Sequence, residues 1–99
     1  MAETIDELTI TWEDDDGVVT TQELDKFVLS KGAWTTIMYL YQDLDRKTGE
    51  MGKKKVRIQR YQKRDGEYKP RSKFNISSAK QAKKIMEGLQ GWFSDDDEE

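Results

Sequence analysis

Cysteine and histidine are both absent from this 99-residue chain, and their absence excludes several kinds of chemistry. Without cysteine the chain has no disulfide, no thiolate nucleophile and no Cys/His zinc site. Without histidine it has no side chain whose ordinary pKa suits a general base near neutral pH. Its carboxylates cluster in turns and at the chain ends, where water screens them and no pocket raises a pKa. We therefore expect no enzyme, no catalytic residue, no bound metal and no cofactor.

Long apolar runs are missing too, and the composition is polar. Hydrophobic residues make up 34% of the chain and charged residues 37%, so the core of the protein must be thin. No run approaches the roughly 18 apolar residues of a membrane helix, and the N-terminus is acidic where a signal peptide would be basic. These features predict a cytoplasmic protein without membrane contact. We expect one domain over residues 6–93, between disordered ends at residues 1–5 and 94–99.

Positive charge is confined to one part of the chain. Fifteen of the 17 lysines and arginines lie in residues 46–84 with only three acids, which gives this segment a net charge of +12. Residues 1–45 carry −9 and residues 85–99 carry −6, so the overall charge of −3 conceals a basic module between acidic flanks. Such a concentration of positive charge is typical of a surface that binds nucleic acid.

Alternating apolar and polar residues predict the strands of a sheet. The pattern is clearest in residues 34–44, which are rich in β-branched and aromatic side chains. Residues 18–29 are ambiguous, because their first four residues favour a strand whereas Leu24, Phe27 and Val28 follow helical spacing; we prefer a strand. The predicted strands are residues 8–12, 18–29, 34–44, 54–63 and 68–76, with a tight hairpin turn at residues 64–67.

Apolar residues at helical spacing follow the last strand, after a possible N-cap at Ser77 or Ser78. The predicted fold class is therefore α+β: an antiparallel four-stranded meander followed by one C-terminal amphipathic helix (β-β-β-β-α), preceded by a short extra strand or an arm. The apolar helix face is expected first to pack against the sheet, and second to form a homodimer, since one helix rarely covers four strands. The dimer interface would comprise Ile85, Met86, Leu89, Trp92 and Phe93.

Basic and aromatic side chains are predicted to share one face of this sheet. Lysine and arginine neutralise phosphates, and tyrosine rings stack on bases with about 1–3 kcal/mol per base. A single strand suits such a face better than a duplex, because its bases are free to stack. The predicted nucleic-acid-binding residues are Tyr39, Tyr41, Lys55, Arg57, Gln59, Tyr61, Lys63, Lys69, Arg71 and Lys73.

Two acidic segments allow more than one interpretation. An EF-hand alignment of the cluster at residues 14–17 would place Trp12, which cannot ligate calcium, at the first ligand position, so we expect a turn there. The acidic tail at residues 95–99 is most simply a solubility tail. Alternatively, it mimics nucleic acid and competes for the basic face.

Several stretches of the basic module resemble the positive cofactor 4 family of transcriptional coactivators and their bacterial relatives. The matching residues are 55–58 with Tyr61, then 66–70, and Lys73 with 76–77, before an amphipathic helix. The wider whirly and purine-rich-element-binding class is similar in layout. The resemblance implies a β-β-β-β-α module that dimerises through its helices and binds single-stranded DNA along curved sheets. On the same basis, it implies nucleic-acid contacts for Arg57, Tyr61, Lys69, Arg71 and Lys73.

The sequence thus favours a non-catalytic protein that binds single-stranded nucleic acid, DNA before RNA, with little sequence preference and a role in transcription. DNA and RNA differ at the 2′-hydroxyl, and no motif in this sequence predicts a contact to that group. The alternative is a protein-interaction module whose basic face docks an acidic partner, because segregated charge also steers proteins.

Overall fold

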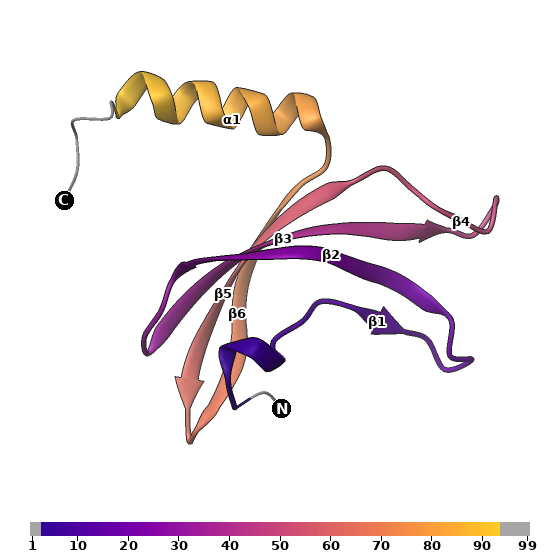
Figure 1. Ribbon diagram of the computed structural model, residues 1–99, viewed down its shortest axis with the longest axis horizontal. Helices are drawn as coiled ribbons and strands as arrows, with labels where there is room; N and C mark the ends of the chain where they lie inside the picture. The colour runs from indigo at the N-terminus through magenta and orange to yellow at the C-terminus, as the bar shows by residue number, and fades with distance from the viewer. Residues whose placement is uncertain (1–2, 94–99) are drawn as a thin grey trace.

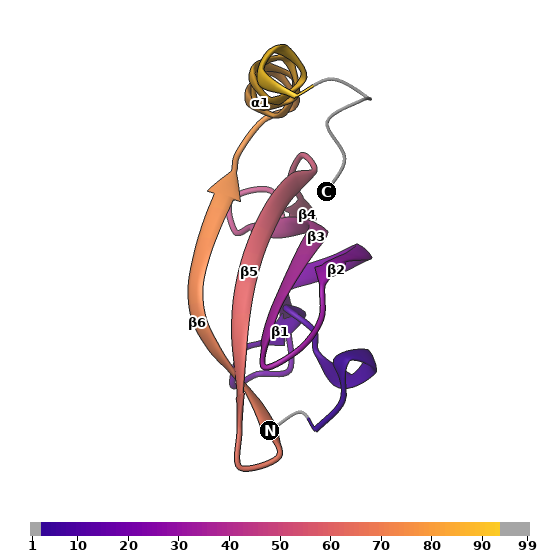
Figure 2. The same cartoon turned by 90° about the vertical axis from the view of Figure 1, so that its left-hand side faces the viewer.

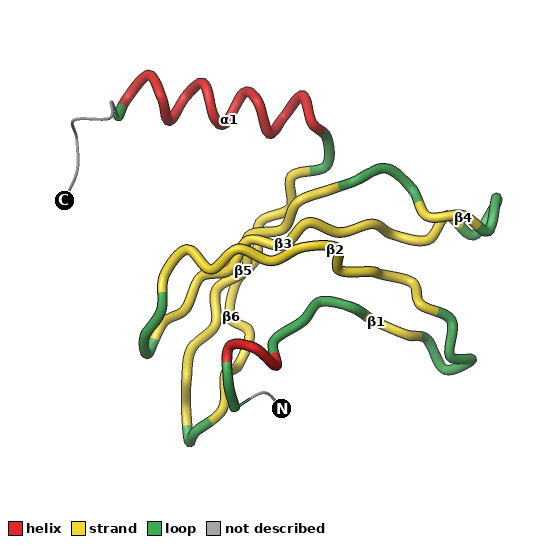
Figure 3. Tube along the Cα trace, viewed as in Figure 1, coloured by secondary structure: helices red, strands yellow, loops and turns green. Residues whose placement is uncertain are grey.

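The computed structural model describes residues 3–93 and shows an α+β fold, with one curled antiparallel sheet and one C-terminal helix (Figures 1 and 3). The predicted fold class is confirmed, and the ambiguous segment after the first turn is a strand. The elements are η1 (Ile5–Glu7), β1 (Trp12–Glu13), β2 (Val19–Ser30), β3 (Trp34–Asp45), β4 (Glu50–Met51), β5 (Lys55–Arg64), β6 (Glu67–Ile76) and α1 (Ala79–Trp92). The predicted acidic tail at residues 94–99 lies outside the described residues.

The strand order in the sheet is β1-β2-β3-β5-β6, and every neighbouring pair is antiparallel. The strand β4 lies off this path and pairs with the end of β3, so the connection between β3 and β5 contains a short hairpin. The turn between β5 and β6 has Asp65 and Gly66 at φ of 53° and 80°. Two successive positive φ angles define the tight hairpin that the sequence predicted.

The core lies on the concave face of the curled sheet, where Figure 2 shows the N-terminal segment inside the curve. Along β3, every second side chain from Thr35 to Tyr41 is buried, and the intervening side chains are partly exposed. An N-terminal arm, residues 4–12, covers this face. Its Leu8 and Ile10 are 6% and 8% exposed and pack into the same cluster as Ile37.

Two side chains of β2 fasten the arm to the sheet. The ammonium group of Lys26 donates hydrogen bonds to the carbonyl oxygens of Ile5 and Leu8, at 2.7 and 2.6 Å. The carboxylate of Glu23 accepts hydrogen bonds from the Thr9 hydroxyl at 2.7 Å and the Ile10 amide at 3.3 Å. Of the two alternatives predicted for residues 8–12, the structure has the arm: the segment is held by side chains, and only its last residue, Trp12, pairs in the sheet.

The helix α1 starts where the sequence predicted, because the Ser78 hydroxyl accepts a hydrogen bond from the Gln81 amide at 3.1 Å. None of its residues is buried. The expectation that its apolar face packs against the sheet of its own chain is wrong: only the first turn, at Ala79 and Ala82, lies against the sheet. The thin core is closed by the arm instead.

Two buried tyrosine hydroxyls, those of Tyr39 and Tyr61, form a 2.8 Å hydrogen bond beneath the arm. Burial raises the pKa of both groups, and their mutual hydrogen bond raises that of Tyr39 further. An acid whose pKa is higher in the folded than in the unfolded chain stabilises the fold below the unfolded value and loses this contribution above it. As a consequence, we expect the free energy of unfolding to fall as pH rises above about 10, the pKa of an unfolded tyrosine. Tyrosinate absorbance and circular dichroism, followed together, should change in one transition. Ionisation of all four tyrosines with the circular dichroism unchanged would contradict this prediction.

Candidate nucleic-acid interface

The sheet register gathers polar side chains on the concave face of β5 and β6. Arg57 lies opposite Tyr39 on one side and opposite Asn75 on the other, and Gln59 lies opposite Lys73. Directly opposed residues of antiparallel strands point to the same face. These four side chains of β5 and β6 therefore form one surface, with Lys73 and Asn75 exposed to solvent.

The orientation of Arg57 is fixed by its neighbours. Its Nε donates a hydrogen bond to Asn75 Oδ1 at 2.9 Å, and its guanidinium lies 4.9 Å from the centre of the Tyr41 ring. No carboxylate among the described residues forms an ion pair with it. Its positive charge therefore stays available for an anionic ligand.

A groove of about 650 Å³ runs between this surface and the N-terminal arm. The strands β5 and β6 supply Arg57, Gln59 and Pro70 to one side, and the arm supplies the other. Most of the lining is apolar, so the groove combines an apolar surface with one basic residue, Arg57, and one acidic residue, Glu7. Its lining residues are Glu7, Leu8, Thr9, Ile10, Thr11, Trp12, Thr21, Arg57, Gln59, Tyr61, Tyr68 and Pro70.

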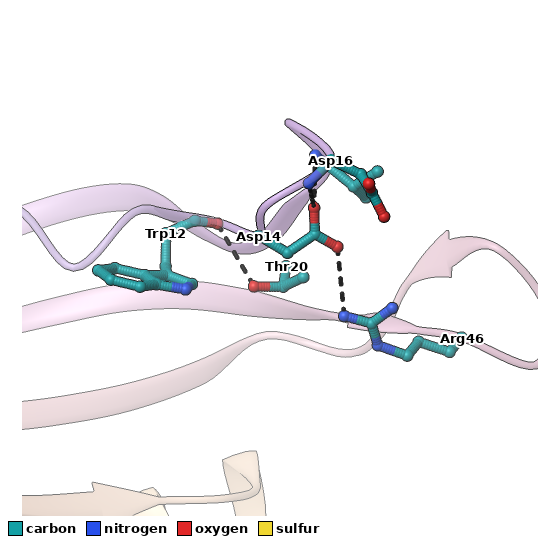
Figure 4. A network of polar contacts seen from close by, with 6 residues as sticks. Trp12, Asp14, Asp16, Thr20 and Arg46 are labelled. Atoms are coloured by element: carbon teal, nitrogen blue, oxygen red, sulfur yellow. Dashed lines mark hydrogen bonds and ion pairs between the residues drawn. The ribbon is translucent and has the colours of Figure 1, made fainter.

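Trp12 is the exposed aromatic side chain of this groove, and it is not among the binding residues predicted from the sequence. It is 68% exposed, and its carbonyl oxygen accepts a 3.4 Å hydrogen bond from the Thr20 hydroxyl (Figure 4). A large apolar ring beside an Asp-rich turn was the available signal. In the sequence, Trp12 continues the period-two pattern of Leu8 and Ile10, from which only a strand was predicted.

The three tyrosines predicted to stack on bases are buried. Tyr39, Tyr41 and Tyr61 are 0%, 2% and 4% exposed, because the N-terminal arm covers the concave face above them. Their predicted role as open stacking platforms is therefore wrong. Of the three, only Tyr61 lines the groove, and it does so with little exposed surface.

Two of the predicted basic residues point to the other face of the sheet. The pairing of β5 with β6 shifts between Arg60 and Tyr61, so Lys69 lies opposite Gln62 and Arg71 donates a 3.1 Å hydrogen bond to the Gln62 side chain. A shift by one residue moves the following side chains to the opposite face. Pro70, which has no amide hydrogen, occupies this irregular site.

The two remaining lysines of β5 lie outside the groove. Lys55 forms a 3.1 Å ion pair with Asp43, and Lys63 lies 5.3 Å from the centre of the Tyr68 ring, near the start of the arm. Both side chains belong to the concave face, as predicted, but at opposite ends of it. Lys63, which forms no ion pair among the described residues, adds positive charge along β5 outside the groove, whereas the charge of Lys55 is balanced by Asp43.

The acidic cluster at residues 14–17 forms a turn, as predicted (Figure 4). One carboxylate oxygen of Asp14 accepts hydrogen bonds from the amides of Asp16 and Val18, at 2.9 and 3.0 Å. The other oxygen lies 3.5 Å from Arg46. The Val18 amide, followed by the other hydrogen bonds, lowers the pKa of this carboxyl group. Asp14 therefore organises the turn as a charged acceptor.

Comparisons of the chain with protein-family models, with curated proteins and with solved structures gave no match. No helix within residues 3–93 is long and apolar enough to cross a membrane. Over the same residues, no three Asp or Glu side chains come together as a metal site would require. The geometry of the groove is therefore the basis for assigning a function.

Proposed function

We propose that this protein is a non-catalytic binder of single-stranded nucleic acid, with DNA preferred to RNA and with little preference for sequence. The observation that carries the proposal is the groove on the concave face, which is lined both by the exposed Trp12 and by Arg57, an arginine that forms no ion pair within residues 3–93. A cation beside an aromatic plane is the usual combination in proteins that bind single strands. The positive charge of residues 46–84 supports the same ligand.

The two sides of the groove suit different parts of a nucleotide. Phosphates would lie towards β5 and β6, where Arg57 and the exposed Lys73 provide positive charge. Bases would lie towards the arm, whose backbone carries the Trp12 ring but also the acidic Glu7. A single strand can turn its bases and phosphates to opposite sides in this way, whereas the bases of a duplex are already stacked and paired.

Truncation of the Trp12 side chain should weaken binding without harming the fold, because this ring is exposed. We expect Trp12→Ala to lower the affinity for an oligo-dT by about tenfold, within the range of one lost base stack. The matched control is Trp34→Ala, since Trp34 is 43% exposed on the opposite face beneath Arg60. Fluorescence anisotropy of a labelled oligonucleotide measures both. An equal loss from the two variants, or no loss from Trp12→Ala, would remove Trp12 from the site.

The family-level expectations remain part of this proposal. A role in transcription rests on the resemblance of the basic module, and a cytoplasmic location stays a prediction. The basic face as a docking site for an acidic protein is the competing function. It predicts that an acidic polypeptide, and not an oligonucleotide, binds in the groove.

A further inference from the structure

One carboxylate, that of Glu7, lies in the groove among side chains that suit a nucleic acid. Glu7 is exposed, lines the groove together with Arg57 and Gln59, and forms no ion pair within residues 3–93. Its negative charge repels the phosphates that Arg57 attracts. Glu7 therefore lowers the general affinity of the groove for a nucleic acid, unless it contacts a base.

Hydrogen bonds hold Glu7 in its place on the arm. The ammonium group of Lys26 binds the arm on both sides of this residue, at the carbonyl oxygens of Ile5 and Leu8, at 2.7 and 2.6 Å. One carboxylate oxygen of Glu7, Oε1, accepts a 2.9 Å hydrogen bond from the Thr4 hydroxyl. The other oxygen, Oε2, is left to accept a hydrogen bond from a ligand.

The sheet register sets Glu7 at the level of two groove residues of β5. Lys26 lies opposite Tyr39, and Tyr39 in turn lies opposite Arg57. The part of the arm that Lys26 fastens is therefore level with Arg57, and Gln59 follows on the same face of β5. Figure 2 shows the arm inside the curve of the sheet. A base held between the arm and β5 would meet a carboxylate from one side and an amide from the other.

These two side chains distinguish the pyrimidine bases by their hydrogen-bonding groups. A carboxylate only accepts hydrogen bonds, whereas an amide both donates and accepts them. Cytosine carries an amino donor, N4, at the position where uracil and thymine carry the acceptor O4. The cytosine amino group can donate to Glu7. The O4 atom of uracil or thymine would instead meet a second acceptor and lose its hydrogen bond to water, which is unfavourable.

We propose that Glu7 makes the groove selective for cytosine over uracil and thymine. The N4 amino group donates to Glu7 Oε2, the Gln59 amide donates to the ring nitrogen N3 of the same base, and Arg57 binds an adjoining phosphate. The selectivity applies to one base position, so most of the strand is still bound without regard to sequence. The inference rests on the proposed function, because it requires a single strand in the groove.

The affinities for oligo-dC and oligo-dU of equal length test this selectivity. Both oligonucleotides lack the thymine methyl group, so the comparison isolates the hydrogen-bonding edge of the base. We expect oligo-dC to bind about fivefold more tightly or more, which is the lower end of the range for one specific base contact. Equal affinities, with binding that is salt-sensitive, would overturn the selectivity and leave the proposed function intact. Absence of binding to both oligonucleotides would overturn the two together.

Glu7→Gln tests which residue is responsible. Its amide can donate to O4, so we expect the ratio of the two affinities to fall towards one, chiefly through tighter binding of oligo-dU. The matched control is Glu13→Gln, which removes the same charge from an exposed residue of β1 outside the groove lining and should preserve the ratio. Both side chains are exposed, so circular dichroism should show that both variants fold. An unchanged ratio in Glu7→Gln, or an equal fall in both variants, would exclude Glu7 as the determinant.

Discussion

Replacement of Arg57 by alanine is expected to lower the affinity for a single-stranded oligonucleotide by about tenfold or more at low salt. A hydrogen bond to a charged group contributes about 1.5–3 kcal/mol, and each 1.4 kcal/mol corresponds to about a factor of ten in affinity. Arg57 is held by Asn75 and by the Tyr41 ring, so it meets a phosphate with little further loss of freedom. Loss of one phosphate contact should also flatten the dependence of log K on log salt concentration by about one unit.

Lys69→Ala is the matched control for this experiment. It removes the same charge from the neighbouring strand, but the register shift near Pro70 turns this side chain to the convex face. Its affinity and salt slope should therefore stay close to wild type, apart from a small long-range effect of net charge. Lys73→Ala, on the concave face, should resemble Arg57→Ala. Equal losses from Lys69→Ala and Arg57→Ala would mean that overall charge, not the groove, determines binding.

Replacement of Ile37 by alanine is expected to destabilise the fold more than any other single change considered. Ile37 is 0% exposed and lies in the middle of the cluster formed by the sheet and the arm. Truncation of a fully buried isoleucine costs about 2–5 kcal/mol, through lost burial and the cavity left behind. Because small domains are stable by only about 5–15 kcal/mol, we expect the melting temperature to fall by at least 10 °C, on the order of several degrees per kcal/mol.

Leu24→Ala provides the comparison, because Leu24 is 43% exposed on the neighbouring strand β2. Its truncation removes a side chain of the same size from a site that keeps much of its contact with water, and should cost about 1 kcal/mol or less. Chemical denaturation of both variants measures the difference. Similar losses for the two would contradict the assignment of the core to the concave face.

Much of the fold could be predicted from the sequence, because the strands and the helix follow from local patterns. The alternation along β3 and β5 separated the two faces of the sheet correctly, and Asp65-Gly66 marked its hairpin. The position of the arm could not be predicted in this way. Its contacts join residues about twenty positions apart, such as Lys26 and Ile5, and leave no periodic signal.

The candidate site was partly predicted from the sequence, and the errors in that prediction have two physical causes. Aromatic side chains on a strand can belong either to the core or to an exposed stacking surface. Tyr39 belongs to the core because the N-terminal arm covers it. The register shift between β5 and β6 moves Lys69 and Arg71 to the other face, although alternation predicts a single basic face. Arg57, Gln59 and Lys73 lie on the other side of this shift from Lys69. These three predicted residues therefore stay together on the concave face.

The central claim is that the groove binds a single strand of nucleic acid. The most direct test is the fluorescence anisotropy of a labelled oligo-dT of about 20 nucleotides, long enough for one such binding site. It should be titrated with the full-length protein at about 50 and 200 mM salt, with unlabelled duplex as competitor. We predict binding that weakens steeply with salt and that duplex displaces poorly. Absence of binding at the lower salt concentration, or equal displacement by duplex, would contradict the account.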